Sequence, residues 1–225
     1  MDIDIAYSPA YAIARVRLAD GESAKGEAGA MMAMTPSVDI ATSTQGGIMK
    51  GLKRSVLGGE SFFMNTFTAK GPGAEVIFAP ALSGDVIHWQ LDGRTVFLQS
   101  GSYLASSMGI EIDSKWGGAK TFFSKEGLFM LKCTGSGDLL VSSYGAIMNV
   151  DLAPGQTYVV DTGHMVGWEE GVSYEVQKVG NWKSTLLGGE GFIVRLTGPG
   201  RVYAQTRSPE SFIAWLTPKL PTQRS

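Results

Sequence analysis

The chain has 225 residues, of which 44% are apolar and 18% charged, and its formal net charge is −2 at pH 7. This composition supplies a sizeable core and excludes an intrinsically disordered chain. The near-neutral balance predicts no strong attraction of the whole surface to nucleic acid or anionic lipid. Glycine occupies 30 positions, which together with the low charge favours tightly turning β-structure over a helical bundle.

The single cysteine, Cys133, excludes an intrachain disulfide framework and is compatible with a reducing compartment. The first residues carry two acids and lack the basic and apolar regions of a secretory signal. No apolar run approaches the length of a membrane-spanning helix. We therefore expect a soluble, cytoplasmic protein.

A pair of glycines eight residues apart recurs three times, each time shortly after a leucine. The pairs are Gly21 and Gly29, Gly93 and Gly101, and Gly155 and Gly163. Successive pairs are 72 and 62 residues apart, so the first copy has a longer interior. Such self-similarity at a nearly fixed period indicates an internal structural repeat.

A second landmark follows each glycine pair in the same order. It consists of a glutamate, an apolar stretch and a Gly-x-Gly turn, with the turns at residues 71–73, 135–137 and 198–200. The glutamates are Glu60, Glu126 and Glu190. Two landmarks that repeat in the same order make chance recurrence of glycine turns a poor explanation.

We therefore predict three tandem β repeats, at 1–80, 81–145 and 146–206, followed by a C-terminal helix and tail at 207–225. A unit of roughly 60 residues buries too little surface to be stable alone, so the repeats should share one compact body. The predicted fold is all-β, with repeats that resemble β-sandwiches or a double-stranded β-helix around a pseudo-threefold axis.

Within the repeats, residues 87–91 alternate between apolar and polar side chains, as in a half-buried strand. Asp92-Gly93 then predicts a tight turn into a second strand. Similar hairpins are expected at Asp20-Gly21 and Pro154-Gly155, and the Gly-x-Gly turns predict a second hairpin in each repeat.

The best helix signal lies near the C-terminus. Ser208 is a suitable N-cap, Pro209 suits the first helical position, and Pro218 would end the helix. We expect this short helix to pack on the body through Phe212, Ile213 and Trp215.

The chain offers little for catalysis or cofactor binding. Its two histidines, His88 and His164, are far apart, and no G-x-S-x-G motif is present, so a Ser-His-Asp triad is not indicated. One cysteine and two separated histidines form no local metal site. Phosphate-binding and dinucleotide motifs are also missing. We expect no cofactor, and we interpret both histidines as surface or hydrogen-bonded residues.

Glu60, Glu126 and Glu190 are candidates for a cluster around the predicted axis, because equivalent positions of three repeats would meet there. Gathered carboxylates would raise one another's pKa and could bind a cation. The alternative interpretation is that each glutamate begins a strand and is solvated or paired.

The segment 46–59 is basic and partly apolar, without an acid, and falls in the extra length of the first repeat. Its candidate interaction residues are Met49, Lys50, Leu52, Lys53 and Arg54. Such a segment could contact an anionic membrane, a partner protein or nucleic acid. Alternatively, it connects two strands, with its apolar side on the body and its charges in solvent.

The string GGIMKGLKRSVLGGESFFMNTFTA at 46–69, followed by a Gly-x-Gly turn and two degenerate copies, resembles the altered-inheritance-of-mitochondria family. The resemblance covers nearly the whole chain, roughly 1–206. It implies a threefold-repeated β-sandwich body similar to the trp RNA-binding attenuation protein, and it is compatible with higher oligomers. It carries no catalytic residue to this chain. Eukaryotic relatives resemble mitochondrial inner-membrane organisation factors, a role that the lack of a transit peptide argues against here.

Together these features favour a non-enzymatic scaffold or interaction protein that forms homo-oligomers. A ligand-binding or enzymatic β-barrel with a pocket between repeats is the first alternative, and it would need His88, His164 or the three glutamates in a deep polar pocket. RNA binding is disfavoured by the net charge. A membrane-surface role through Lys50, Lys53 and Arg54 is a further alternative.

Overall fold

The computed structural model describes residues 1–44, 63–114, 129–178 and 192–221. Most of these residues lie in β-strands, and a short α-helix follows the last strand. This confirms the predicted all-β class with a short C-terminal helix.

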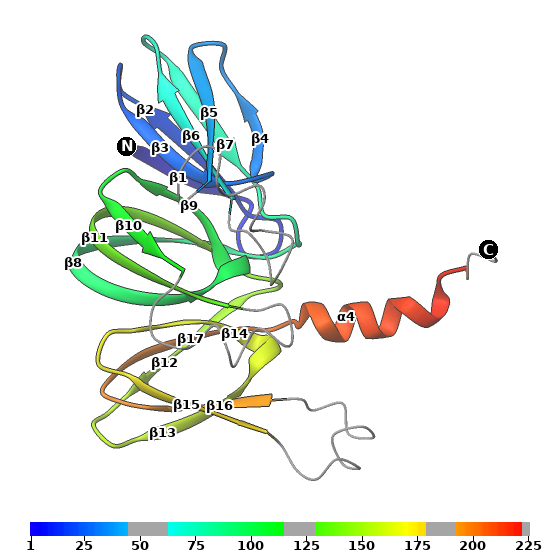
Figure 1. The fold of residues 1–225 in the computed structure, drawn as a ribbon. Helices are drawn as coiled ribbons and strands as arrows, with labels where there is room; N and C mark the ends of the chain where they lie inside the picture. Colours follow the sequence, from blue (N-terminus) through cyan, green and yellow to red (C-terminus); the bar gives the residue numbers. More distant parts are fainter. Residues whose placement is uncertain (45–62, 115–128, 179–191, 222–225) are drawn as a thin grey trace.

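The strands form three successive groups along the chain (Figure 1). The first group contains β1 (Asp2–Ala6), β2 (Ile13–Leu18), β3 (Ser23–Glu27), β4 (Met31–Met34), β5 (Val38–Thr44), β6 (Phe63–Ala69) and β7 (Ala74–Phe78). β2 and β4 both pair with β7, whereas β3 and β5 both pair with β6. β1 is an additional strand, which pairs with β2.

The second group contains two long strands, and each of them takes part in two sheet regions. Its elements are β8 (Val86–Gln99), the 3-10 helix η1 (Ser100–Ser102), β9 (Tyr103–Ser107), β10 (Ile110–Asp113) and β11 (Met130–Ser142). The first half of β8 and also β9 pair with the second half of β11. The second half of β8 and also β10 pair with the first half of β11.

The third group contains six separate strands and the 3-10 helix η3 (Thr162–His164). The strands are β12 (Ile147–Leu152), β13 (Thr157–Asp161), β14 (Met165–Glu169), β15 (Ser173–Lys178), β16 (Phe192–Thr197) and β17 (Gly200–Gln205). β12 and β14 pair with β17, and β13 and β15 pair with β16.

The same four pairings therefore occur in each group once the halves of β8 and β11 are counted separately. We number the six strands or half-strands of each group in chain order as its segments, leaving out the additional strand β1. The first and third segments then pair with the sixth, and the second and fourth pair with the fifth. A bulge also recurs in the third segment of each group. Met32, Leu104 and Val166 are the bulge residues, which have no facing residue on β7, β11 and β17 respectively. The predicted threefold axis and repeat boundaries stay predictions.

Two antiparallel junctions join the groups. β3 of the first group pairs with β9 of the second, and β8 of the second pairs with β14 of the third. A ten-stranded sheet thereby runs through all three groups, with a four-stranded sheet (β1-β2-β7-β4) and a three-stranded sheet (β13-β16-β15) beside it. Among the described strands, none of the third group pairs with one of the first.

The predicted hairpins at Asp20-Gly21, Asp92-Gly93 and Pro154-Gly155 are wrong, although the glycines do adopt positive φ. Gly93 has φ of 95°, yet β8 continues through it, and its two halves pair with different parts of β11 rather than with each other. The Gly-x-Gly sites behave alike, since β11 continues through Gly135 and Gly137. These glycines are corners at which a two-stranded ribbon bends from one sheet region into the next.

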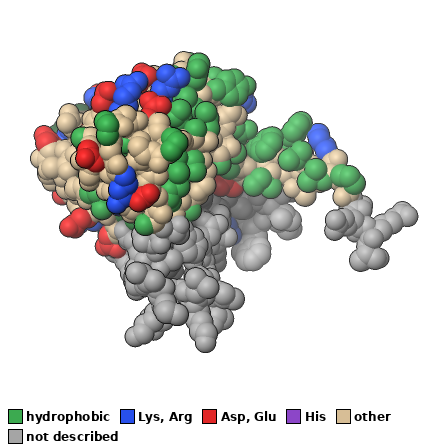
Figure 2. Space-filling model, turned by 90° about the horizontal axis from the view of Figure 1, so that it is seen from above, with side chains coloured by type: hydrophobic (Ala, Val, Ile, Leu, Met, Phe, Trp, Pro, Cys, Tyr) green, Lys and Arg blue, Asp and Glu red, His purple; other side chains and the backbone are tan. Residues whose placement is uncertain are grey.

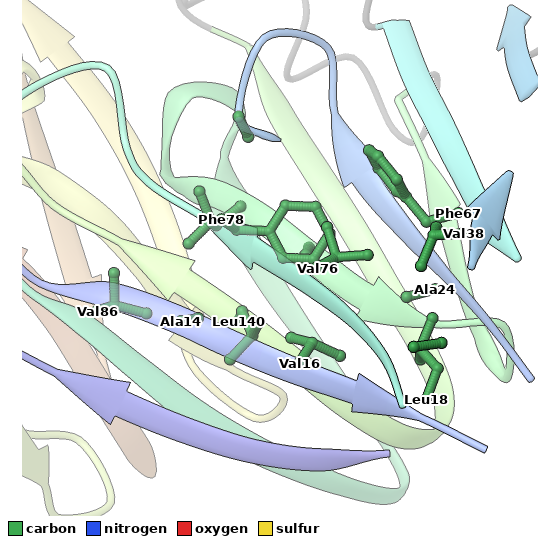
Figure 3. Close-up of a cluster of buried hydrophobic side chains, with 14 of the residues drawn as sticks. Ala14, Val16, Leu18, Ala24, Val38, Phe67, Val76, Phe78, Val86 and Leu140 are labelled. Atoms are coloured by element: carbon green, nitrogen blue, oxygen red, sulfur yellow. The ribbon is translucent and has the colours of Figure 1, made fainter. Parts of the chain in front are cut away.

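Buried apolar side chains form three clusters, and each cluster takes residues from more than one group. The cluster in Figure 3 joins Phe67 and Phe78 of the first group to Val86 and Leu140 of the second. The next cluster adds Met64 and Val166 to the second group's own residues. The third, built around Trp168, includes Met130. Burial is therefore shared across both junctions, as expected of units too small to be stable alone.

The C-terminal helix α4 (Pro209–Leu216) begins as predicted. The Ser208 hydroxyl accepts a hydrogen bond from the Ser211 amide at 3.2 Å, and Pro209 occupies the first turn. A 3-10 turn, η4 (Thr217–Lys219), follows it. The predicted packing holds only for Phe212, which contacts the Tyr144 ring. The rest of α4 extends away from the body (Figure 1), and Ile213 and Trp215 are 59% and 58% exposed. Local capping fixes where this helix starts but does not bury its apolar face.

Candidate functional site

A groove of about 420 Å³ lies where β8 of the second group meets β14 and β17 of the third. Its walls combine aromatic, acidic and basic side chains. The lining residues are His88, Trp89, Gln90, Leu91, Arg94, Thr95, Val96, Glu169, Glu170, Arg201 and Tyr203. This position corresponds to the predicted pocket between repeats, and the groove contains His88, one of the residues that the ligand-binding alternative requires.

Two aromatic rings form one wall of the groove. Trp89 and Tyr203 pack with ring centroids 4.4 Å apart, and the Tyr203 hydroxyl donates to Glu169 Oε1 at 3.2 Å. Burial raises the pKa of Tyr203 to about 12, with the Glu169 carboxylate as a second cause. At neutral pH this phenol is therefore a fixed hydrogen-bond donor rather than a base.

The two arginines of the groove are each paired with a neighbouring aspartate. Arg201 holds Asp151 through two hydrogen bonds of 2.5 and 3.1 Å, and Arg94 Nε donates to Asp92 at 2.7 Å. The hydrogen bond to Asp151 raises the pKa of Arg201. Both signs of charge are thus balanced along the rim, which suits a neutral or amphipathic ligand better than a polyanion.

The histidines are hydrogen-bonded, as their interpretation predicted. His88 Nε2 lies 2.8 Å from Asp138 Oδ1, and His164 Nδ1 lies 2.8 Å from the Gln205 carbonyl oxygen. Ser208, which lines a cavity together with His164, instead donates to Glu210 at 2.9 Å while it caps α4. No nucleophile–histidine pair joined by a hydrogen bond is therefore formed among the residues that the structure describes.

Within the described ranges, no group of three or more His, Cys, Asp or Glu side chains is placed to hold a metal ion. Cys133 is buried at 0% exposure, and burial raises the pKa of its thiol to about 12. At neutral pH it is a protonated apolar side chain.

A second cavity of about 330 Å³ lies between the body and the start of α4. Phe212 meets Tyr144 edge-on with centroids 6.1 Å apart and stacks on Trp215 at 6.1 Å. Lys219 lies over the Trp215 ring at 4.8 Å. Figure 2 shows hydrophobic side chains along this helix and on the side of the body from which it extends. The described residues thus leave the apolar side chains Phe212, Ile213 and Trp215 of this helix exposed.

A third, smaller cavity of about 200 Å³ contains Glu27. Burial raises the pKa of this carboxyl from 4.5 to about 7. Glu27 therefore changes charge near neutral pH, unlike an ordinary surface glutamate.

The site residues predicted from the sequence all lie outside the described residues. This applies to the basic segment with Met49, Lys50, Leu52, Lys53 and Arg54, and also to Glu60, Glu126 and Glu190. Both hypotheses stay predictions.

Sequence reasoning offered a pocket between repeats as one alternative but did not identify the aromatic pair that lines this groove. Trp89 was assigned to the apolar face of its strand, where it is indeed partly buried, but its partner Tyr203 comes from a strand more than a hundred residues away. Only the equivalence of the repeats could have indicated that β8 meets the third group.

The part of the chain that the structure describes contains no helix long and apolar enough to cross a membrane. What it defines is an all-β protein in which the same strand pairings recur along the chain, with a groove between the second and third groups.

Comparison with known proteins identifies the family. The family model described as mitochondrial biogenesis AIM24 matches residues 3–207, and the chain belongs to this family. An uncharacterized protein of Streptococcus pyogenes serotype M6 is 28% identical over 230 residues, which cover 99% of this chain and 92% of that protein. The predicted family resemblance is thereby confirmed.

A crystal structure of a Streptococcus pyogenes protein superposes with a TM-score of 0.81. It is 24% identical and is covered to 99%, with 97% of this chain matched. At this identity the likeness shows the fold alone, and it extends over nearly all of both chains.

Proposed function

We propose that the protein is a non-enzymatic scaffold that assembles with further copies of itself and presents apolar surface to other proteins. The observation that carries the proposal is the unburied apolar face of α4, where Phe212, Ile213 and Trp215 are 39%, 59% and 58% exposed. A helix of eight residues is marginal in water unless its apolar side is packed against something. Contact with another chain would supply that packing.

The chemistry of the described residues supports a binding role rather than turnover. The histidines are held by Asp138 and by a backbone carbonyl, the thiol is buried and protonated, and the Tyr203 phenol is a donor. A general base or nucleophile would need a free, poised group in a cavity. These groups are instead engaged in holding the fold together, which leaves Glu27, whose pKa is about 7, as the poised group in a described cavity.

Native mass spectrometry of the full chain at increasing protein concentration tests the proposal. We expect defined species larger than the monomer, whose share rises with concentration. Replacing the exposed side chains in the variant Ile213→Ser/Trp215→Ser should reduce binding of an apolar fluorescent dye. A strict monomer at all concentrations would contradict the proposal.

The groove between β8 and β17 supports a second candidate function, the binding of a small amphipathic ligand. Its aromatic wall and paired charges provide stacking and hydrogen bonds without a net field. A thermal-shift screen with the wild type and the variant Trp89→Ala tests this idea. A ligand that stabilises both chains equally does not bind in the groove.

The remaining partner hypotheses, an anionic membrane surface or nucleic acid, depend on residues 46–59. The net charge of −2 makes nucleic acid the weaker of the two. Vesicle co-sedimentation of the wild type and the variant Lys50→Glu/Lys53→Glu/Arg54→Glu tests the membrane hypothesis.

A further inference from the structure

Of the strand edges that lack a partner among the described residues, two are counterparts of the strands at the junctions, and they lie in different groups. One is the outer edge of β4 in the four-stranded sheet, and the other is the outer edge of β13 in the three-stranded sheet. Their counterparts in the other groups are the strands that form the junctions: β9 and β14 correspond to β4, and β3 and β8 correspond to β13. The two free edges are therefore the two halves of a junction of the same kind.

The two existing junctions have the same register. In the first, Lys25 faces Ser106, and in the second, Phe97 faces Trp168. The glycine pairs place equivalent residues 72 positions apart between the first and second groups and 62 apart between the second and third. Adding 72 to the β3 residue and 62 to the β9 residue of each pair in the first junction gives a pair of the second junction. The complete pairs are Ala24–Ser107, Lys25–Ser106 and Gly26–Ala105 in the first, and Val96–Glu169, Phe97–Trp168 and Leu98–Gly167 in the second.

Burial distinguishes β4 sharply from its counterparts. The first four residues of β9 and of β14 are all buried, whereas no residue of β4 is. At the bulge position, Leu104 and Val166 are 0% exposed, but Met32 is 58% exposed. β4 thus presents to solvent the surface that its counterparts bury.

The edge of β13 shows the matching feature. Val159, which corresponds to Lys25 and Phe97 at the junctions, is 45% exposed, although those two residues are half-buried. Exposed strand edges with apolar side chains are templates for pairing with another chain.

We propose that β13 of one copy pairs antiparallel with β4 of a second copy, in the register of the two internal junctions. The predicted pairs are Tyr158–Thr35, Val159–Met34 and Val160–Ala33. This inference rests on the self-association of the proposed function and names its surfaces.

The fold favours a second copy as the occupant of each edge. β4 belongs to the group at one end of the stack and β13 to the group at the other end (Figure 1). The contact joins two different surfaces, so each copy offers one free edge at either end, and assembly proceeds head to tail into a ring or a filament.

The innermost pair of each existing junction contains a small residue: Gly26 faces Ala105, and Gly167 faces Leu98. In the proposed pairing Ala33, the counterpart of Ala105 and Gly167, would face Val160.

Charge substitutions at the two edges test the inference in the full-length protein. The edge variants are Met34→Lys and Val159→Glu, since a lysine (Lys25) already occupies the position equivalent to Val159 at the first junction. Matched controls are Ile40→Glu on β5 and Met148→Lys on β12, which are 41% and 43% exposed on the outermost strands of the ten-stranded sheet. Native mass spectrometry then compares all five chains at one concentration, and an equal mixture of the two edge variants.

We expect the wild type and both controls to form the same oligomers and each edge variant alone to lose them. The mixture should form a heterodimer, because the Met34→Lys chain keeps an intact β13 and the Val159→Glu chain keeps an intact β4. Unfolding of a variant cannot produce this recovery. Edge variants that assemble like the wild type, or a mixture that stays monomeric, would overturn the inference and leave the scaffold proposal standing. A monomeric wild type would overturn both.

Discussion

Phe97 and Trp168 stack across the junction of β8 and β14, with ring centroids 5.6 Å apart. Trp168 is fully buried, and it also packs against Tyr174 at 4.9 Å. One side chain thus connects the second group to the core of the third. The equivalent side chains at the free edges, Val159 and Met34, are both exposed.

Removing the Trp168 ring should destabilise the folded protein strongly. We expect Trp168→Ala to lower the free energy of unfolding by about 3–5 kcal/mol, because it leaves a large cavity at the junction. The control Trp215→Ala removes a ring that is 58% exposed and should change stability by less than about 0.5 kcal/mol. Urea unfolding followed by circular dichroism measures both. Equal losses would mean that Trp168 does not link the groups.

The bent-ribbon geometry predicts different costs at two glycines of the same positive-φ class. Gly93 has φ of 95° and open space around it, so Gly93→Ala should cost about 1–2 kcal/mol through backbone strain alone. At Gly135, with φ of 118°, a Cβ would also lie 2.2 Å from the Gly109 carbonyl oxygen. Gly135→Ala should therefore cost at least about 2 kcal/mol more. The melting temperatures of the two variants measure this difference. Equal losses for Gly93→Ala and Gly135→Ala would contradict the close approach at Gly135.

Glu27 should make stability fall as pH rises toward neutrality. Its pKa is raised from 4.5 to about 7 in the folded chain, so the folded state holds the proton in a range where the unfolded state has released it. The unfolded state is therefore increasingly favoured between these two values.

The variant Glu27→Gln removes this penalty and should exceed the wild type in stability by on the order of 1–3 kcal/mol at about pH 8. The difference should shrink to a constant offset below about pH 4.5, where both states are protonated. Urea unfolding at both pH values measures it. A difference that is independent of pH would contradict a buried Glu27 carboxyl.

Cys133 should not react with a thiol reagent while the protein is folded. Its side chain is fully buried, and burial raises the pKa of the thiol to about 12, so little thiolate forms at neutral pH. The control variant Met108→Cys introduces a thiol where the side chain is 51% exposed and should react at once. Reaction of the wild type at the control's rate would show that this core opens easily.

The sequence predicted those features that depend on neighbouring residues. The recurring Gly21, Gly93 and Gly155 adopt positive φ, and Ser208 with Pro209 marks the start of α4. Both follow from backbone sterics and capping within a few residues.

Features that depend on distant strands were predicted less well. Asp92-Gly93 has the composition of a hairpin turn, yet the strand continues because β11 provides partners on both sides of it. A local pattern does not contain that partner. For the same reason the Trp89–Tyr203 ring pair and the exposure of Trp215 were not anticipated, since each is decided by which elements meet in space.

Head-to-tail pairing of β13 with β4 is tested most directly by disulfide trapping with the double variant Met34→Cys/Val159→Cys. Facing residues of an antiparallel pair lie within reach of a disulfide, and the native Cys133 is buried. The account predicts a series of cross-linked multimers after oxidation. A control, Met34→Cys/Met148→Cys, should give none. Equal cross-linking of both variants, or only monomer from the first, would contradict the account.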